Sequence, residues 1–336
     1  MTVVVTGASG HVGANLVRAL LDQGRTVRSL VHVNRQALAG LDIEIVEGDI
    51  GNPESLLKAF DGAEVVYHLA AAISLLMSSW PLLERVNVIG TRNVVEACLR
   101  SGVRRLVHFS SIHALRQEPL EAAVNESRPL VDSPRCPPYD RSKAAGEIEI
   151  CRGLEKGLDA VIVSPTAIIG PHDYRPSHFG RILLDLARGQ LAGLVAGGFD
   201  WVDARDVACT AIRAEEVAPT GAKYLLSGHW VSLCDLADMV AAITGTAAPR
   251  FVCPLWLARA GAPLVTAFNR LAGKRPLYTS AAILALCGNR SISHDRATRE
   301  LGYEPRPLRE TLAATLEWFV ATGQLDRPLK PEPGPR

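Results

Sequence analysis

The stretch TVVVTGASGHVG, residues 2–13, decides the fold. It opens with a β-branched, apolar run that is typical of a buried strand. Gly7, Gly10 and Gly13 follow, and the apolar spacing of a helix begins at Val12. In this pattern the three glycines permit a tight turn, close approach of the backbone to a pyrophosphate, and close packing of helix on sheet. The helix N-terminus then offers free N–H groups to the phosphates. The stretch therefore predicts a dinucleotide-binding turn; the alternative is a plain glycine-rich turn.

Strand-like and helix-like segments alternate through the first half of the chain. Such alternation predicts right-handed crossovers and a parallel sheet with helices on both faces. We therefore expect an α/β fold with a Rossmann-type, doubly wound parallel sheet. Strands are predicted at 2–6, 26–31, 42–48, 64–70, 104–111 and 159–165, and helices at 12–23, 53–60, 81–100 and 139–156.

The second half is less regular. Helices are predicted at 179–188, 232–243 and 307–321, a strand-to-helix segment at 201–214 and a late strand at 222–228. We expect a dinucleotide-binding domain from 1–166 and 201–231, and a smaller, mostly helical C-terminal substrate-binding domain from 167–200 and 232–324. The Pro-rich tail, 325–336, is expected to be disordered.

Composition excludes several classes of protein. At 48% hydrophobic and 21% charged residues, the chain of 336 residues can build a large core and is not globally disordered. A net charge of +1 provides no electrostatic footprint for nucleic acid. The seven cysteines form no C-x-x-C pair, which disfavours both a disulfide framework and a zinc site and fits a reducing cytoplasm. The N-terminus lacks a basic region, so it predicts a first strand and not a signal peptide.

The longest apolar segment is VCPLWLARAGAPLVTAFNRLA, residues 252–272. Arg259, Arg270 and two prolines interrupt it, so it does not predict a membrane-spanning helix. It is compatible with a helix on a membrane surface, but we expect an amphipathic helical region of a domain core.

The pentapeptide YDRSK, residues 139–143, opens a predicted helix. Tyr139 and Lys143 are four residues apart and therefore share a face. An ammonium beside a phenol stabilises the phenolate and lowers the tyrosine pKa from its ordinary value of about 10. The pair suggests proton transfer, whereas the alternative is an ordinary surface helix.

Several ordered motifs together resemble the extended short-chain dehydrogenase/reductase family, over about residues 2–322. The family pattern TGxxGxxG matches residues 6–13, and an acid after the third strand matches Asp49. A strand motif matches HLAA at 68–71, and a helix motif matches NVIGTRNV with Asn87. Later matches are FSSIHA with Ser111, YDRSK, SPTAIIGP at 164–171, FDWVDARDVA and LGYEPRPLRETLAATLEWF.

The resemblance implies a catalytic set of Ser111, Tyr139, Lys143 and Asn87. Tyr139 would donate a proton to a substrate carbonyl or take one from an alcohol, and Ser111 would orient the same oxygen. Lys143 would lower the tyrosine pKa and bind the nicotinamide ribose, while Asn87 would hold its helix and a proton-relaying water. Judged alone, Asn87 is also compatible with an ordinary helix residue and Ser111 with a strand-end hydroxyl.

The resemblance also implies a cofactor site along the strand ends. The strand ending LVHVNRQ carries no acid; His32 stands where reductases of the family often carry arginine, and Arg35 follows. This favours NADP(H) over NAD(H), because an acid there binds the ribose hydroxyl of NAD. The expected cofactor-binding residues are Gly7, Ser9, Gly10, His11, Val12, Gly13, His32, Arg35, Asp49, Ile50, Leu69, Ala70, Ala71, Tyr139, Lys143, Pro165, Thr166 and Ile168.

The family contains reductases, epimerases and dehydratases. Dehydratases carry Asp-Glu where this chain has Ile112 and His113, and nucleotide-sugar enzymes carry asparagine where it has Ser164-Pro165-Thr166. The pattern is more similar to the dihydroflavonol reductase and 3β-hydroxysteroid dehydrogenase branch. We therefore expect an NAD(P)-dependent oxidoreductase that interconverts a carbonyl and a secondary alcohol on an apolar small molecule. The alternative is a nucleotide-sugar epimerase; a cofactor sensor without chemistry is disfavoured by the intact Tyr/Lys pair.

Remaining expectations concern the pocket, metals and assembly. His113 either reaches the pocket or, as we expect, is a packed, hydrogen-bonded histidine. His172 and His178 lack a third ligand at useful spacing, so no metal site is expected. A homodimer is expected through the helices at 81–100 and 139–156, where Ala144 and Ala145 allow close approach or pack on the sheet. The apolar substrate wall is expected to comprise Ala72, Ile73, Leu75, Met77, Ile169, Phe179, Leu183 and Trp201.

Overall fold

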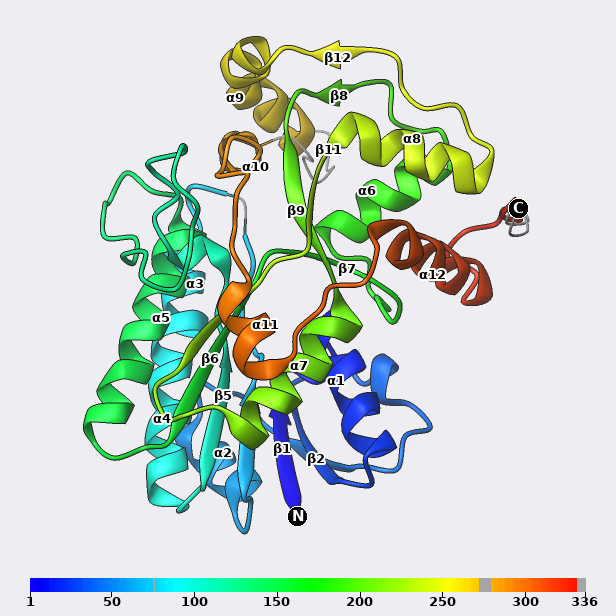
Figure 1. Ribbon diagram of the computed structural model, residues 1–336. Helices are drawn as coiled ribbons and strands as arrows, with labels where there is room; N and C mark the ends of the chain where they lie inside the picture. Colours follow the sequence, from blue (N-terminus) through cyan, green and yellow to red (C-terminus); the bar gives the residue numbers. More distant parts are fainter. Residues whose placement is uncertain (75, 272–278, 331–336) are drawn as a thin grey trace.

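The computed structural model describes residues 1–74, 76–271 and 279–330. Its central element is a seven-stranded sheet with the order β10-β6-β5-β4-β1-β2-β3 (Figure 1). Every neighbouring pair in this sheet is parallel. The strands are β1 (Thr2–Thr6), β2 (Thr26–Val31), β3 (Glu44–Glu47), β4 (Val65–His68), β5 (Arg105–Phe109), β6 (Ala160–Pro165) and β10 (Lys223–Leu226).

Helices cover both faces of this sheet, and the alternation of side chains along β1 shows why. Val3 and Val5 point into a core with α1 (His11–Asp22) and α7 (Ala204–Val217). Val4 points into a second core on the other face, with α2 (Pro53–Phe60), α4 (Gly90–Arg100) and α5 (Pro138–Glu155). Since successive side chains of a strand point to opposite faces, a run of three valines requires two apolar layers. The predicted doubly wound α/β fold is confirmed.

The strand order reverses at β1, which pairs with β2 on one side and β4 on the other. Thr6 is opposite Leu30 in the first pair and opposite His68 in the second. Ligands of open α/β sheets bind outside the carboxyl ends of the strands at such a switch point. The predicted site residues follow the ends of β1, β2, β3, β4, β5 and β6, so the topology brings them to one edge of the sheet.

The predicted helix at 81–100 is present but not uniform. It comprises α3 (Trp80–Leu83), a π-helical segment at Glu84–Ile89 and α4. The segment carries Asn87, which is buried. π-Helical turns are rare and occur often at functional sites.

A third core holds the C-terminal part together. The predicted helices are found as α6 (His178–Ala187), α8 (Leu233–Thr244) and α12 (Leu308–Ala321). Two small sheets, which were not predicted, accompany them: β11-β9-β7 and β12-β8. Their strands are β7 (Ala167–Ile169), β8 (Leu194–Val195), β9 (Gly198–Asp203), β11 (His229–Ser232) and β12 (Val252–Cys253), and further helices are α9 (Leu255–Leu271), α10 (Ser280–Ala285) and α11 (Asp295–Leu301).

The apolar segment at 252–272 contributes β12 and α9. Leu255 and Ala258 pack against the third core, as expected for part of a domain core. Trp256 at the start of α9 is nevertheless 71% exposed. Each helix in the described part of the chain is too short or too polar to cross a membrane.

Candidate active site

The glycine turn after β1 has the geometry that its sequence predicts. Gly7 has φ +75°, and a Cβ there would lie 2.5 Å from the backbone nitrogen of Ala70. A Cβ at Gly13 would overlap the carbonyl oxygen of Gly7, so only glycine lets α1 begin so close to the strand. At Gly10 the nearest atom to such a Cβ is Gly7 O, at 3.3 Å. The residues present therefore fit a pyrophosphate cradle, with the exposed Gly10 at the N-cap of α1.

His11, at the start of α1, fastens the glycine turn to a distant segment. Its Nε2 lies 3.0 Å from Gly170 O and 3.1 Å from Pro171 O, so the ring donates to these carbonyls. The Asn15 side chain donates to Pro171 O as well, at 2.9 Å. Ser9 and Val12 lie in the same turn and are half-buried. The segment after β7 thus closes over the first turn of α1.

The ends of β2 and β3 place two basic side chains next to two acids. His32 Nε2 lies 3.4 Å from Asp49 Oδ2, and His32 is 71% exposed. Arg35 forms an ion pair with Glu47. Asp49 also accepts a hydrogen bond from Gly51 N, at 2.6 Å. Both side chains are accessible, yet each already faces a carboxylate.

Beyond β4, the backbone of Leu69 and Ala70 lies against Gly7 of the glycine turn, and Asn87 anchors the loop that begins at Ala72. Asn87 Oδ1 accepts from Ala72 N at 2.8 Å, and its Nδ2 donates to Ala72 O at 2.9 Å. Nδ2 also donates to Ser142 Oγ, at 2.9 Å, and that hydroxyl donates to Tyr139 O at 2.7 Å. Asn87 therefore ties the end of β4 to the helix that carries Tyr139. Ile50, which follows β3, is buried, and its carbonyl accepts a hydrogen bond from the Asn93 side chain.

Ser111 and Tyr139 meet beyond the end of β5. Their side chains interact, and Ser111 Oγ accepts from His113 N at 3.2 Å. Burial raises the pKa of Tyr139 to about 12; the hydrogen bond with Ser111 acts in the opposite direction and Asp140 adds to the rise. The lowering of the tyrosine pKa by Lys143 is not among these effects, and it stays a prediction for the complex with cofactor.

Lys143 reaches the end of β5 from α5. Its Nζ donates to Phe109 O at 2.7 Å. Burial lowers the pKa of Lys143 to about 8, and the negative charge of Glu147 opposes this. Glu147, which was not predicted, is 1% exposed, accepts from Ser110 Oγ at 2.5 Å and pairs with Lys223. Its spacing of four residues from Lys143 was the available signal, because it places both on one helix face.

The strand β6 brings the last predicted cofactor residues to the same edge. Pro165 ends this strand, and Thr166 Oγ1 donates to Asp200 Oδ1 at 2.7 Å. Ile168 lies in β7 and packs against the first core. The Thr166 hydroxyl thus bonds to β9, and its backbone N–H donates to Leu226 O at 3.3 Å, at the end of β10.

The expected apolar substrate wall divides into two groups. Ile73 and Met77 are 72% and 52% exposed in the loop after β4. Ile169, Leu183 and Trp201 are instead buried in the third core, where apolar packing and a hydrogen bond from Trp201 Nε1 to Val231 O hold them. Leu75 lies outside the described residues, Ala72 is half-buried, and Phe179 packs on Trp201 with ring centroids 5.0 Å apart.

His172 and His178 are in aromatic contacts. The rings of His172 and Tyr174 stack with centroids 6.2 Å apart, and His178 contacts Phe179. Burial lowers the pKa of each histidine to about 4. Within the residues that the structure describes, no group of three or more His, Cys, Asp or Glu side chains is arranged to hold a metal ion.

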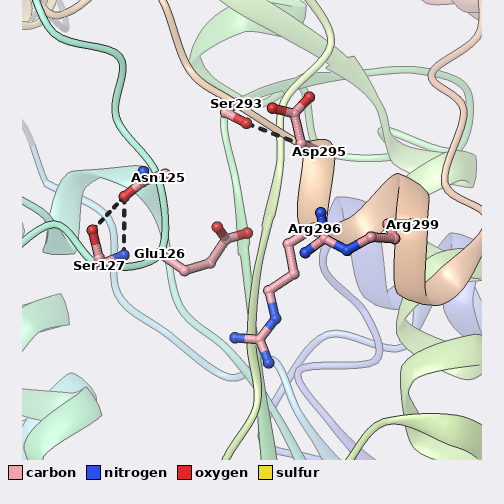
Figure 2. A pocket seen from close by; sticks show the side chains of 7 residues that line it. All are labelled: Asn125, Glu126, Ser127, Ser293, Asp295, Arg296 and Arg299. Atoms are coloured by element: carbon pink, nitrogen blue, oxygen red, sulfur yellow. Dashed lines mark hydrogen bonds between the residues drawn. The ribbon is translucent and has the colours of Figure 1, made fainter.

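A polar hollow of about 460 Å³ lies apart from these residues. It lies between residues 125–127 and the start of α11 (Figure 2). Glu126 and Arg296 lie on opposite sides of it, and neither was predicted to be functional. Glu126 Oε1 accepts from Leu225 N, at 3.1 Å, in the edge strand β10. The acid thereby satisfies a free N–H of the sheet edge, a structural role.

Comparisons with known proteins agree with this geometry. The model of the NAD dependent epimerase/dehydratase family matches residues 3–226. "Sterol demethylase protein B" of Methylococcus capsulatus is 36% identical, over 97% of this chain and 100% of its own length. A "putative dihydroflavonol 4-reductase" of Synechocystis is 32% identical, over 95% and 94%. The crystal structure of gox2253 has a TM-score of 0.85 at 32% identity and covers 97% of this chain and 99% of its own.

Proposed function

Because this chain belongs to the NAD dependent epimerase/dehydratase family, within the extended short-chain dehydrogenases/reductases, we propose that it is an oxidoreductase that interconverts a carbonyl and a secondary alcohol on an apolar small molecule. The observation that carries this proposal is the proximity of the Ser111 and Tyr139 side chains, close enough for Ser111 to lower the pKa of Tyr139, at the sheet edge that also holds the glycine turn. The names of two relatives, a sterol demethylase protein and a putative dihydroflavonol 4-reductase, support an apolar ring-bearing substrate.

In this mechanism, Tyr139 is the proton donor for the substrate oxygen. A pKa of about 12 keeps its phenol protonated at neutral pH, as a donor must be. The Ser111 hydroxyl holds the same oxygen, so the two side chains position it and stabilise its developing negative charge. A nicotinamide dinucleotide, when bound, supplies or accepts the hydride.

Lys143 and Asn87 act around this pair. Lys143, fixed at Phe109 O, lies on the same face of α5 as Tyr139 and supplies positive charge there. Asn87 keeps α5 in place against the loop after β4, through Ser142 and Ala72. We assign both residues to the catalytic set on these grounds.

The glycine turn and residues 69–71 would hold the pyrophosphate and the neighbouring ribose, and Asp49 and Ile50 the adenine side. We propose NADP(H) as the preferred coenzyme, because the Arg35 guanidinium and the His32 ring are accessible and β2 ends without an acid. NAD(H) is the alternative, since Glu47 and Asp49 neutralise part of this charge.

Two features of the whole molecule extend the proposal. Leu82, Ile89 and Ile148 expose 45%, 41% and 42% of their area on the helices at 80–100 and 138–155, which supports a homodimer through this face. Ala144 is buried within the subunit and Ala145 is half-buried. We also retain the two-domain division of the chain and a cytoplasmic location as proposals.

The test is a screen of NADH and NADPH oxidation with apolar ketones and aldehydes, together with UDP- and GDP-sugars. We expect net oxidation of coenzyme with a ring-bearing ketone and none with the sugars. A nucleotide-sugar epimerase, which the family name includes, would instead convert a sugar nucleotide without net oxidation. That outcome would replace the oxidoreductase proposal.

A further inference from the structure

His113 contacts both members of the proposed proton-transfer site. Its ring and that of Tyr139 are 5.9 Å apart between centroids, at an interplanar angle of 66°. Its backbone N–H donates to Ser111 Oγ, at 3.2 Å. The side chain is 33% exposed and its ring faces Asp140, so it has the polar partner but not the full enclosure of the packed, hydrogen-bonded histidine expected from the sequence. Its ring therefore lies beside the two side chains that are proposed to hold the substrate oxygen.

An acid holds this histidine in one orientation. His113 Nδ1 lies 3.3 Å from Asp140 Oδ1, and Asp140 is the residue immediately after Tyr139 on α5. The ring thus presents Nδ1 to the carboxylate, and the other ring nitrogen, Nε2, points away from the acid. Burial lowers the pKa of His113, but the charge and hydrogen bond of Asp140 outweigh burial and raise it above its ordinary value. A carboxylate that orients a histidine and raises its basicity is the arrangement of a general base.

Charge balance disfavours a role in anion binding. The protonated pair of His113 and Asp140 has no net charge, so it lacks the excess positive charge of a carboxylate or phosphate site. The proton transfer to the carbonyl oxygen already has its donor in Tyr139. A ketone has one other site where a proton can be exchanged, the C–H of the carbon next to its carbonyl. That carbon lies two bonds from the oxygen that Tyr139 and Ser111 hold.

We propose that His113, oriented by Asp140, exchanges a proton at the carbon next to the carbonyl of a bound ketone. The inference rests on the proposed function, because Tyr139 and Ser111 must hold the carbonyl oxygen. The C–H bond breaks and its proton moves to His113 Nε2. The bonding pair forms a C=C bond, and the carbonyl π electrons move to the oxygen, which becomes an enolate held by the two hydroxyls. Return of a proton from Nε2 to the same carbon restores the ketone, with no oxidant or reductant consumed.

The test uses the full chain with NADP⁺ and, separately, NAD⁺, so that no reducing equivalent is present. The probe is 2-methylcyclohexanone in D₂O, and NMR follows deuterium incorporation next to the carbonyl. Its reduction with NADPH or NADH is measured in parallel. We expect the protein to accelerate exchange over buffer and His113→Asn to lower the ratio of exchange to reduction about 100-fold, the lower range for a general base. His113→Gln is the second variant in case the first does not fold.

Asp140→Asn tests the positioning role. Loss of the carboxylate should shift the pH profile of exchange to lower pH, because Asp140 raises the pKa of His113. The other titratable side chain that contacts this ring is Tyr139. Exchange no faster than in buffer, while reduction proceeds, overturns the inference and leaves the proposed function intact. A ratio of exchange to reduction that is unchanged in both His113 variants overturns the inference as well. Absence of reduction with every ketone of the screen overturns the proposed function and, with it, this inference.

Discussion

Lys143 Nζ donates a hydrogen bond of 2.7 Å to the backbone oxygen of Phe109, the last residue of β5. This contact joins the helix that carries Tyr139 to the strand whose end carries Ser111. Because Phe109 and Lys143 are 34 residues apart in the chain, the bond aligns groups that the sequence does not place together. A charged donor also makes it stronger than a neutral hydrogen bond.

The pH dependence of ketone reduction should report the charge of Lys143. Its pKa, lowered by burial to about 8, means that the ammonium is present below this pH and lost above it. Tyr139 stays protonated throughout this range, with a pKa of about 12. We expect kcat for reduction to be level from about pH 6 and to fall above about 8. Lys143→Arg, which keeps its charge, should be slower but lack this fall; a wild-type rate that stays level to pH 10 would contradict the assignment.

Gly7→Ala should destabilise the protein far more than Gly24→Ala. Both glycines have φ near +70°, at +75° and +69°, so both changes cost the strain of a left-handed alanine, about 1–2 kcal/mol. At Gly7 the new Cβ would also lie 2.5 Å from Ala70 N, whereas at Gly24 no atom lies within 4 Å. Overlap of this kind adds about 1–3 kcal/mol. Urea unfolding of the two variants measures the difference in the free energy of unfolding. Equal losses would refute the close approach of the glycine turn to the loop at Ala70.

Coenzyme choice can be tested at the pair formed by Arg35 and Glu47. If Arg35 binds the 2′-phosphate, Arg35→Ala should raise the Kd of NADPH about tenfold, the equivalent of about 1.4 kcal/mol. Glu47→Gln should lower it, because Arg35 loses its competing partner. The matched control is Arg28→Ala, which removes an arginine paired with Glu44 across the same two strands. A Kd for NADPH that is insensitive to Arg35 would instead favour NAD(H).

Asn87→Ala should lower stability and kcat together. It leaves Ala72 N and O without their side-chain partner and removes the donor to Ser142. Each unsatisfied buried group costs about 1–3 kcal/mol, so we expect a total loss of about 3 kcal/mol. Ser142→Ala removes one of these bonds and should cost about a third as much. Denaturant unfolding and kcat for both variants provide the measurement; two equal and small losses would show that Asn87 is an ordinary helix residue.

Much of the fold follows from local patterns that the sequence displays. The valine run of β1 and the glycines after it predicted the first unit, and the alternation of segments predicted the parallel sheet. Strands of two to four residues such as β8 and β11 were missed, because they are too short to show a period. The π-helical segment around Asn87 was missed as well, since its apolar spacing is that of an ordinary helix.

Individual site residues could be predicted from motifs, but their partners could not. The contacts of Lys143 with Phe109 and of His113 with Asp140 join separate elements, so they depend on tertiary structure. Trp201 shows a second limit of prediction from sequence. An apolar residue near a site looks the same in the sequence whether it lines a pocket or packs in a core, and Trp201 packs in a core with 1% exposure.

The central claim, that Tyr139 is the proton donor, is tested most directly by Tyr139→Phe. The change keeps the ring that contacts His113 and removes only the hydroxyl that interacts with Ser111. Tyr174→Phe is the control. The Tyr174 hydroxyl accepts a hydrogen bond from Arg18, at 2.7 Å, and has no part in the proposed chemistry. We predict that kcat for ketone reduction falls about 10²–10⁴-fold in Tyr139→Phe, with the Kd of coenzyme nearly unchanged. A kcat equal to that of Tyr174→Phe would contradict the account.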